Sequence, residues 1–178
     1  MTQQDAGRQE SSRPPGGRGQ PIVVGVDGSP SSLRALRWAV RQAGLVGAPV
    51  EAVIAWQDPA VYSTGFEWAP VSFDGDSLAA AAEKVLADSL AQVTAGQQTE
   101  MPPTQVLPRV VQGHPAQVLL EAARGAQMLV VGSRGHGTLA GMLLGSVSQH
   151  CVQHAPCPVL VVPAVPQPSP AAAPDTAG

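Results

Sequence analysis

The sequence is poor in aromatic residues and cysteine, and both shortages limit what the chain can be. Phenylalanine, tryptophan and tyrosine make up 3% of the residues, so the core has to be built from Val, Leu, Ile and Ala. The two cysteines, Cys151 and Cys157, are too few for a disulfide framework.

Long apolar runs and an excess of positive charge are also missing. No apolar run approaches the roughly 18 residues of a membrane span, and no apolar segment follows basic residues near the N-terminus as in a signal peptide. The formal net charge of −3 is too weak to favour nucleic acid or an anionic membrane surface as partner. We therefore expect a cytoplasmic protein that binds neither nucleic acid nor membrane.

Length and composition predict one domain between two tails. The chain has 178 residues, of which 44% are apolar, enough for one globular domain with a sizeable core. Residues 1–19 are rich in Gln, Arg, Ser, Gly and Pro without apolar periodicity, and residues 164–178 are mostly Pro and Ala. Because such compositions are typical of disorder, we expect a folded domain over residues 20–163 and a disordered tail on each side.

Strand and helix signals alternate through this domain. Short apolar runs predict strands, and apolar residues at helical spacing predict helices between them. The strands are expected at 22–26, 50–56, 105–111, 128–131 and 158–162, the helices at about 33–43, 77–93, 114–124 and 146–154, and a long loop at 57–75. The alternation predicts an α/β fold: a doubly wound, five-stranded parallel sheet with helices on both faces, similar to the Rossmann fold. Pro108 weakens the third strand and suggests an edge position.

Ligands of such sheets bind beyond the carboxyl ends of the strands, near a switch in strand order. Two turns lie at such ends, the segment Asp27-Gly28-Ser29 and the glycine-rich loop that begins at Gly132. That loop ends at Gly145-Ser146, where a helix is expected to start, and a helix start suits phosphate. Strand, glycine loop and helix start are the parts of a phosphate cradle, although a glycine loop without a ligand has the same pattern.

Two common phosphate motifs do not fit. A Walker A loop needs Gly-Lys-Ser/Thr, whereas Lys84 is the only lysine of the chain and lies far from the loop. The dinucleotide fingerprint belongs after the first strand, where the turn is too short for it. His150, Cys151, His154 and Cys157 suggest a metal site, but Pro156 breaks the helix before Cys157, so we expect ordinary packing and no metal.

The glycine loop resembles that of the universal stress protein family. ATP-binding members carry Gly, two residues, Gly, nine residues and Gly-Ser/Thr, and this chain has Gly132, Gly135 and Gly145-Ser146 at that spacing. Three further segments resemble the family: the first strand and acidic turn at 23–29, the helix start at 113–116 and the last strand at 154–162. The resemblance spans about residues 20–163.

The resemblance implies a fold of the adenine nucleotide alpha hydrolase type and ATP, with Mg²⁺, as cofactor. It implies that Asp27 bonds the ribose, that Ala55 or Trp56 lies beside the adenine, and that Gly132 contacts the ribose or α-phosphate. The expected phosphate cradle is Gly135, Gly145, Ser146, Val147 and Ser148. It also implies a homodimer that pairs through the last strand. Arg134 is either a contact of the γ-phosphate or a solvated side chain, and Asp27 has the alternative role of a helix cap.

The predicted function is that of an ATP-binding stress-response protein that regulates a partner and has no catalytic residue. A slow ATPase or phosphotransfer enzyme that uses the same site is the alternative from another class. A cyclic-AMP-binding module and a nucleotide-free dimerisation module are two further readings. Phe66 and Trp68, in the predicted loop, are candidate contacts for a nucleotide or a partner.

Overall fold

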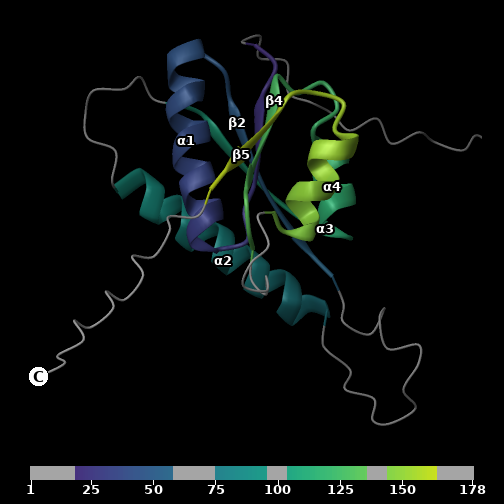
Figure 1. Cartoon of the computed structure of the whole chain (residues 1–178). Coiled ribbons are helices and arrows are strands. Elements are labelled where there is room, and N and C mark those ends of the chain that lie inside the picture. The colour runs from purple at the N-terminus through teal and green to yellow at the C-terminus, as the bar shows by residue number, and fades with distance from the viewer. Residues whose placement is uncertain (1–18, 58–74, 96–103, 136–143, 164–178) are drawn as a thin grey trace, which may run out of the picture.

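The computed structural model describes residues 19–57, 75–95, 104–135 and 144–163 (Figure 1). Within these ranges strands and helices alternate along the chain. They are β1 (Ile22–Gly25), α1 (Pro30–Val46), β2 (Val50–Trp56), α2 (Gly75–Ala95), β3 (Val106–Gln112), α3 (Pro115–Ala122), β4 (Met128–Gly132), α4 (Ser146–His154) and β5 (Val159–Val162). The predicted order of elements is confirmed.

All neighbouring strands pair in parallel, in the order β3-β2-β1-β4-β5. The chain runs outward from β1 to β3 and then returns to the other side of β1 with β4, so the strand order reverses between β1 and β4. Val24 pairs with Val130 across this junction. The predicted doubly wound parallel sheet is therefore confirmed, and so is the edge position of β3, the strand that contains Pro108.

The helices form one layer on each face of the sheet, α1 and α2 on one and α3 and α4 on the other (Figure 1). Alternate residues of a strand point to opposite faces, so Ile22 and Val24 pack under α1 while Val23 packs under α3. As predicted, the largest fully buried side chains of the described residues are aliphatic, apart from Cys151.

The chemistry at its two ends explains where α1 starts and stops. Ser29 is the N-cap, and its side-chain oxygen accepts a hydrogen bond of 3.3 Å from the backbone N–H of Ser32. Pro30 then occupies the first turn, and Gly47 ends the helix in the left-handed conformation at φ 67°. Since Ser29 caps the helix, the alternative reading of Asp27 as its cap is wrong.

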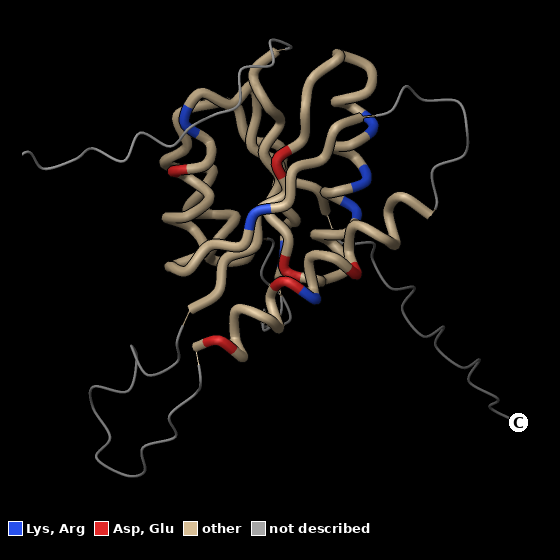
Figure 2. Tube along the Cα trace, turned by 180° about the vertical axis from the view of Figure 1, so that it is seen from behind, with Lys and Arg blue, Asp and Glu red and all other residues tan. Residues whose placement is uncertain are grey.

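Charged positions lie mainly on the helices and turns (Figure 2). Glu51, the second residue of β2, is an exception, since it is only 8% exposed. Its carboxylate accepts a hydrogen bond from the guanidinium of Arg109 on the neighbouring strand β3. A carboxylate at this depth needs such a partner, because burial without one is costly.

Several expectations fall on residues that the structure does not describe. They are the two tails, most of the predicted loop at 57–75 with Phe66 and Trp68, and the middle of the glycine loop. Among the described residues, no helix combines the length and the apolar character that crossing a membrane requires.

Candidate functional site

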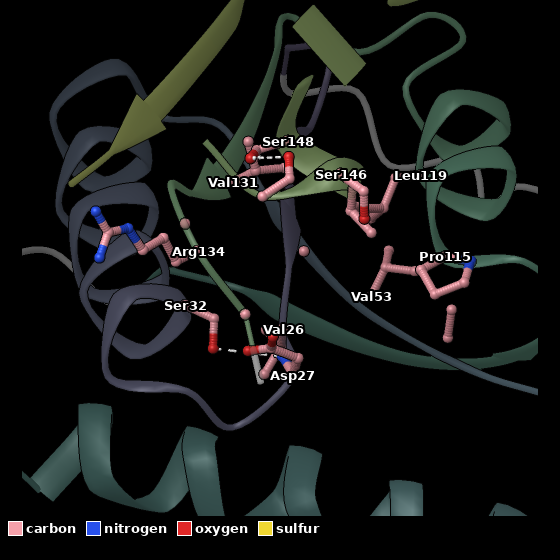
Figure 3. A pocket seen from close by; sticks show the side chains of 16 residues that line it. Val26, Asp27, Ser32, Val53, Pro115, Leu119, Val131, Arg134, Ser146 and Ser148 are labelled. Atoms are coloured by element: carbon pink, nitrogen blue, oxygen red, sulfur yellow. Dashed lines mark hydrogen bonds between the residues drawn. The ribbon is translucent and has the colours of Figure 1, made fainter. Parts of the chain in front are cut away.

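A cavity of about 360 Å³ opens at the carboxyl ends of β1 and β4, where the strand order reverses (Figure 3). This volume lies within the range of small-molecule sites. Its wall combines the turn after β1, both ends of the glycine loop, the end of β2 and the first turns of α3 and α4. The wall includes most of the predicted site residues: Asp27, Gly132, Arg134, Gly135, Gly145, Ser146, Val147 and Ser148.

Trp56 is the one predicted site residue that does not line the cavity. Side chains alternate along β2, so Val53 and Ala55 face the cavity whereas Ile54 and Trp56 pack into the core on the side of α1 and α2. Of the two residues expected beside an adenine, the structure therefore brings Ala55 to the site and corrects the choice of Trp56.

Sequence reasoning missed the apolar part of the wall. Val26 follows β1, Val53 lies on β2, and Pro115 and Leu119 lie one helical turn apart on α3. Pro115 belongs to the segment 113–116 that the family resemblance had marked, and this was the only signal that α3 borders the site. The cavity thus offers apolar contact area as well as polar groups.

Asp27 lines the cavity from the tight turn after β1. Its Oδ1 accepts hydrogen bonds from the backbone N–H of Ser29 at 2.9 Å and from the Ser29 hydroxyl at 2.6 Å. The other carboxylate oxygen lies against the glycine loop, since a Cβ added to Gly135 would stand 2.5 Å from Asp27 Oδ2. Glycine at 135 is therefore what lets the loop approach the carboxylate.

Gly132 serves a different purpose. A Cβ at this position would lie 2.6 Å from the Ser31 Oγ and 2.9 Å from both the carbonyl carbon of Ser31 and the backbone nitrogen of Ser32. The start of α1 therefore packs directly on the end of β4. Gly132 keeps the two halves of the cavity wall together, whatever contact its backbone makes with a ligand.

Side chains and backbone groups hold both ends of the glycine loop. The Ser31 hydroxyl donates a hydrogen bond to the carbonyl of Arg134. At the far end, the N–H of Gly145 donates to the carbonyl of Ser133 at 2.7 Å, and the Ser148 hydroxyl donates to the same carbonyl at 3.1 Å. The site is therefore preformed at both ends of the loop.

Three of the predicted site residues are oriented by contacts other than a ligand. The N–H of Gly145 bonds the carbonyl of Ser133, and the hydroxyl of Ser148 bonds the carbonyls of Ser133 and Gly145, so both groups are used within the loop. Arg134 extends its guanidinium toward α1 in Figure 3, away from Ser146. The groups aimed at a ligand have to be sought in the first turn of α4.

Helix α4 begins at the wall of the cavity with Ser146. Its N-cap, Gly145, has no side chain to bond the first turn, and the first backbone N–H groups of a helix lack acceptors inside the helix. They carry the partial positive charge of the helix dipole, which favours anions. With Asp27 and the apolar wall, the cavity suits a ligand that joins a flat apolar group, hydroxyls and phosphate.

The candidate metal ligands do not come together. His150 and His154 stack on the surface of α4 with ring centroids 4.3 Å apart, whereas Cys151 is buried in the core. Burial raises the pKa of the Cys151 thiol to about 11 and also raises the pKa of Cys157. Within the described ranges, no three His, Cys, Asp or Glu side chains gather in a possible metal site.

Comparison with known sequences links this chain to one family. The model of the universal stress protein family matches residues 19–163. A universal stress protein of Mycobacterium tuberculosis strain H37Rv is 40% identical over 152 residues, which cover 82% of this chain and 46% of that protein. One of Mycolicibacterium smegmatis is 38% identical over 143 residues, covering 80% of this chain and 45% of the relative. The chain thus spans about half the length of these curated relatives.

Solved structures show the same fold. A universal stress protein in complex with cAMP is 30% identical, with a TM-score of 0.55, and the match covers 80% of this chain and 95% of the other. The protein from Lactobacillus plantarum is 22% identical, with a TM-score of 0.64 and coverages of 83% and 99%. The one from Archaeoglobus fulgidus in complex with dAMP is 22% identical, with a TM-score of 0.57 and coverages of 80% and 97%. Given the match of the family model over residues 19–163, this chain belongs to the universal stress protein family.

Proposed function

We propose that the chain binds ATP, with Mg²⁺, in the cavity between β1 and β4 and acts as a nucleotide-dependent regulatory protein. The observation that carries the proposal is the first turn of α4, whose N–H groups open onto the cavity without a capping side chain. Solved relatives in complex with cAMP and dAMP support an adenine nucleotide as the ligand.

Each part of a nucleotide finds matching groups in the wall. The apolar residues Val53, Ala55 and Leu119 suit the adenine ring. Asp27, whose carboxylate lies beside the loop, suits the ribose hydroxyls because a carboxylate accepts hydrogen bonds. The N–H groups of Ser146, Val147 and Ser148 suit the phosphates. Bound Mg²⁺ would neutralise phosphate charge, with the Ser146 hydroxyl as the nearest candidate ligand from α4.

We propose binding rather than fast turnover. Phosphoryl transfer needs a group that orients or deprotonates the nucleophile. Among the described residues that line the cavity, Asp27 is the only carboxylate, and its Oδ1 already accepts two hydrogen bonds from Ser29. ATP occupancy would instead change the surface formed by the glycine loop and α4, and so the partner that this surface accepts.

A second copy of the chain is the proposed partner of strand β5. Within the described residues, β5 pairs only with β4, so its other edge is unpaired, and its side chains Val159, Leu160 and Val161 are half-buried. An apolar edge strand invites pairing with another strand. We therefore propose a homodimer through β5, which light scattering tests: Val161→Lys should yield monomers, and an unchanged mass would rule out this interface.

Calorimetric titration of the full, nucleotide-stripped chain tests the nucleotide proposal. ATP with Mg²⁺ should bind with micromolar affinity, about −8 kcal/mol. GTP, which adds a polar group on the purine against the apolar wall, should bind more weakly. Preference for cAMP over ATP would replace the ligand but keep the site. Absence of binding by any adenine nucleotide to folded protein would refute the proposed function.

A further inference from the structure

The outer face of α1 has a composition that is unusual for a solvated helix. Arg34, Trp38, Arg41 and Leu45 recur at i, i+4, i+7 and i+11, with Arg37 beside them, so all five lie on one side of the helix. We call these five residues the α1 face. They span roughly 16 Å along the helix at about 1.5 Å per residue.

The charge of the α1 face has a single sign. Helix α1 contains three arginines and neither Asp nor Glu, and Figure 2 shows basic positions stacked along it without an acidic one between them. None of the three arginines forms an ion pair with any described residue. Like charges at these spacings destabilise a helix slightly, so this arrangement is not explained by the stability of α1.

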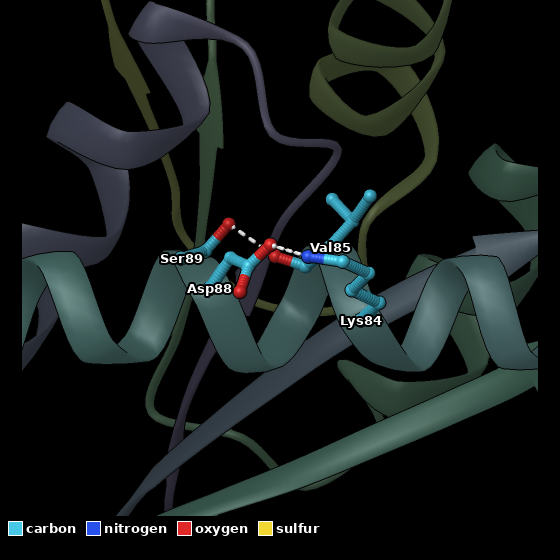
Figure 4. Close-up of polar contacts among 4 residues, drawn as sticks. All are labelled: Lys84, Val85, Asp88 and Ser89. Atoms are coloured by element: carbon cyan, nitrogen blue, oxygen red, sulfur yellow. Dashed lines mark hydrogen bonds and ion pairs between the residues drawn. The ribbon is translucent and has the colours of Figure 1, made fainter.

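Helix α2 shows what an ordinary exposed helix of this chain looks like. Lys84 pairs with Asp88 one turn later at 2.6 Å, and both side chains are well exposed (Figure 4). Arg124, which follows α3, likewise pairs with Glu121 at 3.0 Å. The other exposed Lys and Arg residues of the described ranges, Lys84, Arg109 and Arg124, thus each form an ion pair, and the three arginines of α1 do not.

The α1 face also carries apolar surface. Leu45 is 73% exposed, the largest exposed fraction among the big apolar side chains of the described residues. Trp38 is half-buried, with part of its ring packed against the core and part left accessible. Arginine and tryptophan are the residues most enriched at the energetic centres of protein interfaces.

We propose that the α1 face binds an acidic segment of a protein partner, one that presents two or three carboxylates beside an apolar side chain. Arginine forms paired hydrogen bonds with a carboxylate, and Leu45 and Trp38 provide the apolar contact. Three arginines are fewer than the six to ten phosphate contacts of a typical DNA site and the roughly four to eight basic residues of a membrane-binding cluster. The net charge of −3 also opposes a long polyanion, whereas a short acidic segment feels mainly the local charge.

Fluorescence anisotropy of the full chain tests the proposal with a labelled 12-residue peptide made of Glu-Glu-Leu repeats. A peptide of Gln-Gln-Leu repeats is the control for charge. The Glu peptide should bind saturably and more weakly at high salt, and the Gln peptide should not bind. The double variant Arg37→Gln/Arg41→Gln should weaken binding about tenfold, since each exposed pair contributes modestly. Leu45→Ser should weaken it as well.

The matched control is the double variant Lys84→Gln/Arg124→Gln, which changes the net charge by the same amount elsewhere on the surface. It should bind the Glu peptide as the original chain does. Because the α1 arginines repel one another, Arg37→Gln/Arg41→Gln should melt at the same temperature or higher, so lost binding would not reflect lost folding. Equal losses in the two double variants, no binding of the Glu peptide, or tighter binding of duplex DNA or phosphatidylserine vesicles would each overturn the proposal.

Discussion

Replacing Gly132 by alanine should destabilise the whole fold, although the residue belongs to the glycine motif. The new Cβ would stand 2.9 Å from the carbonyl carbon of Ser31 and from the backbone nitrogen of Ser32. These are backbone atoms of the first turn of α1 and cannot swing aside, so α1 must shift away from β4. Forcing a methyl group into a packed contact costs about 1–3 kcal/mol. A domain of this size should then melt about 2–12 °C lower.

Urea unfolding followed by far-ultraviolet circular dichroism measures this loss. Gly75→Ala is the matched control, because the nearest atom to its Cβ, the Trp56 Cη2, lies at an ordinary 3.8 Å. It should unfold at the original midpoint or slightly above it, since alanine favours a helix. If Gly132→Ala unfolds together with the control, the close contact between α1 and β4 does not exist as described.

Gly135→Ala separates binding from folding in the same loop. Among the described residues, the only atom closer than 3.0 Å to its Cβ would be the Asp27 Oδ2, at 2.5 Å, which belongs to a side chain that can move. The free energy of unfolding should change less than in Gly132→Ala, while calorimetry should show weaker ATP binding because the displaced carboxylate is the proposed ribose ligand. The opposite ranking of the two variants would contradict the roles assigned to these glycines.

Four further expectations concern the core and the loop. Burial raises the pKa of the Cys151 thiol from 9.0 to about 11, so as the pH rises the unfolded chain loses this proton at a lower pH than the folded chain does. The free energy of unfolding should therefore fall between pH 9 and 11, and it should fall less steeply in Cys151→Ala. Under native conditions a thiol reagent should modify the half-buried Cys157 before Cys151, and simultaneous modification would contradict the burial. Arg109→Met leaves the Glu51 carboxylate buried and unpaired, so urea unfolding should show a free energy of unfolding about 1–3 kcal/mol lower. If the lost ion pair is the cause, the double variant Arg109→Met/Glu51→Leu should show no such loss of stability. Ser31→Ala removes the bond to the glycine loop and should cost about 1 kcal/mol in the same assay, so an unchanged midpoint would contradict it.

The sequence predicted the elements well because their ends carry clear local signals. Apolar runs bounded by glycine and proline located the five strands, and α4 runs from Ser146 to His154 as expected. The edge position of β3 also follows from local chemistry, because Pro108 in this strand cannot donate a ladder hydrogen bond.

The site was predicted only in part because its contacts are distant in sequence. Strand β2 is buried on both faces, so its nearly continuous apolar sequence gave no alternation to show that Ala55 and not Trp56 faces the cavity. Leu119 reaches the wall only because α3 packs over β1 and β2. The contact of Gly132 with Ser31 joins two segments on opposite sides of the strand-order switch, which no local pattern reveals.

The central claim is that the backbone N–H groups at the start of α4 hold the phosphates, and substitution of Ser146 tests it most directly. Ser146 is the first residue of the helix, where proline fits, and Gly145 already has the extended conformation that precedes a proline, at φ −75° and ψ 162°. Ser146→Pro therefore removes one N–H group without disturbing the helix, whereas Ser146→Ala removes only the hydroxyl.

Calorimetric titration with ATP and Mg²⁺ should show Ser146→Pro binding about 10- to 100-fold more weakly than Ser146→Ala, because a hydrogen bond to a charged group contributes about 1.5–3 kcal/mol. The melting temperatures of the two variants should agree, which would assign the loss to binding. Equal ATP affinities of the two folded variants would contradict the account, because the helix N-terminus would then not be the phosphate site.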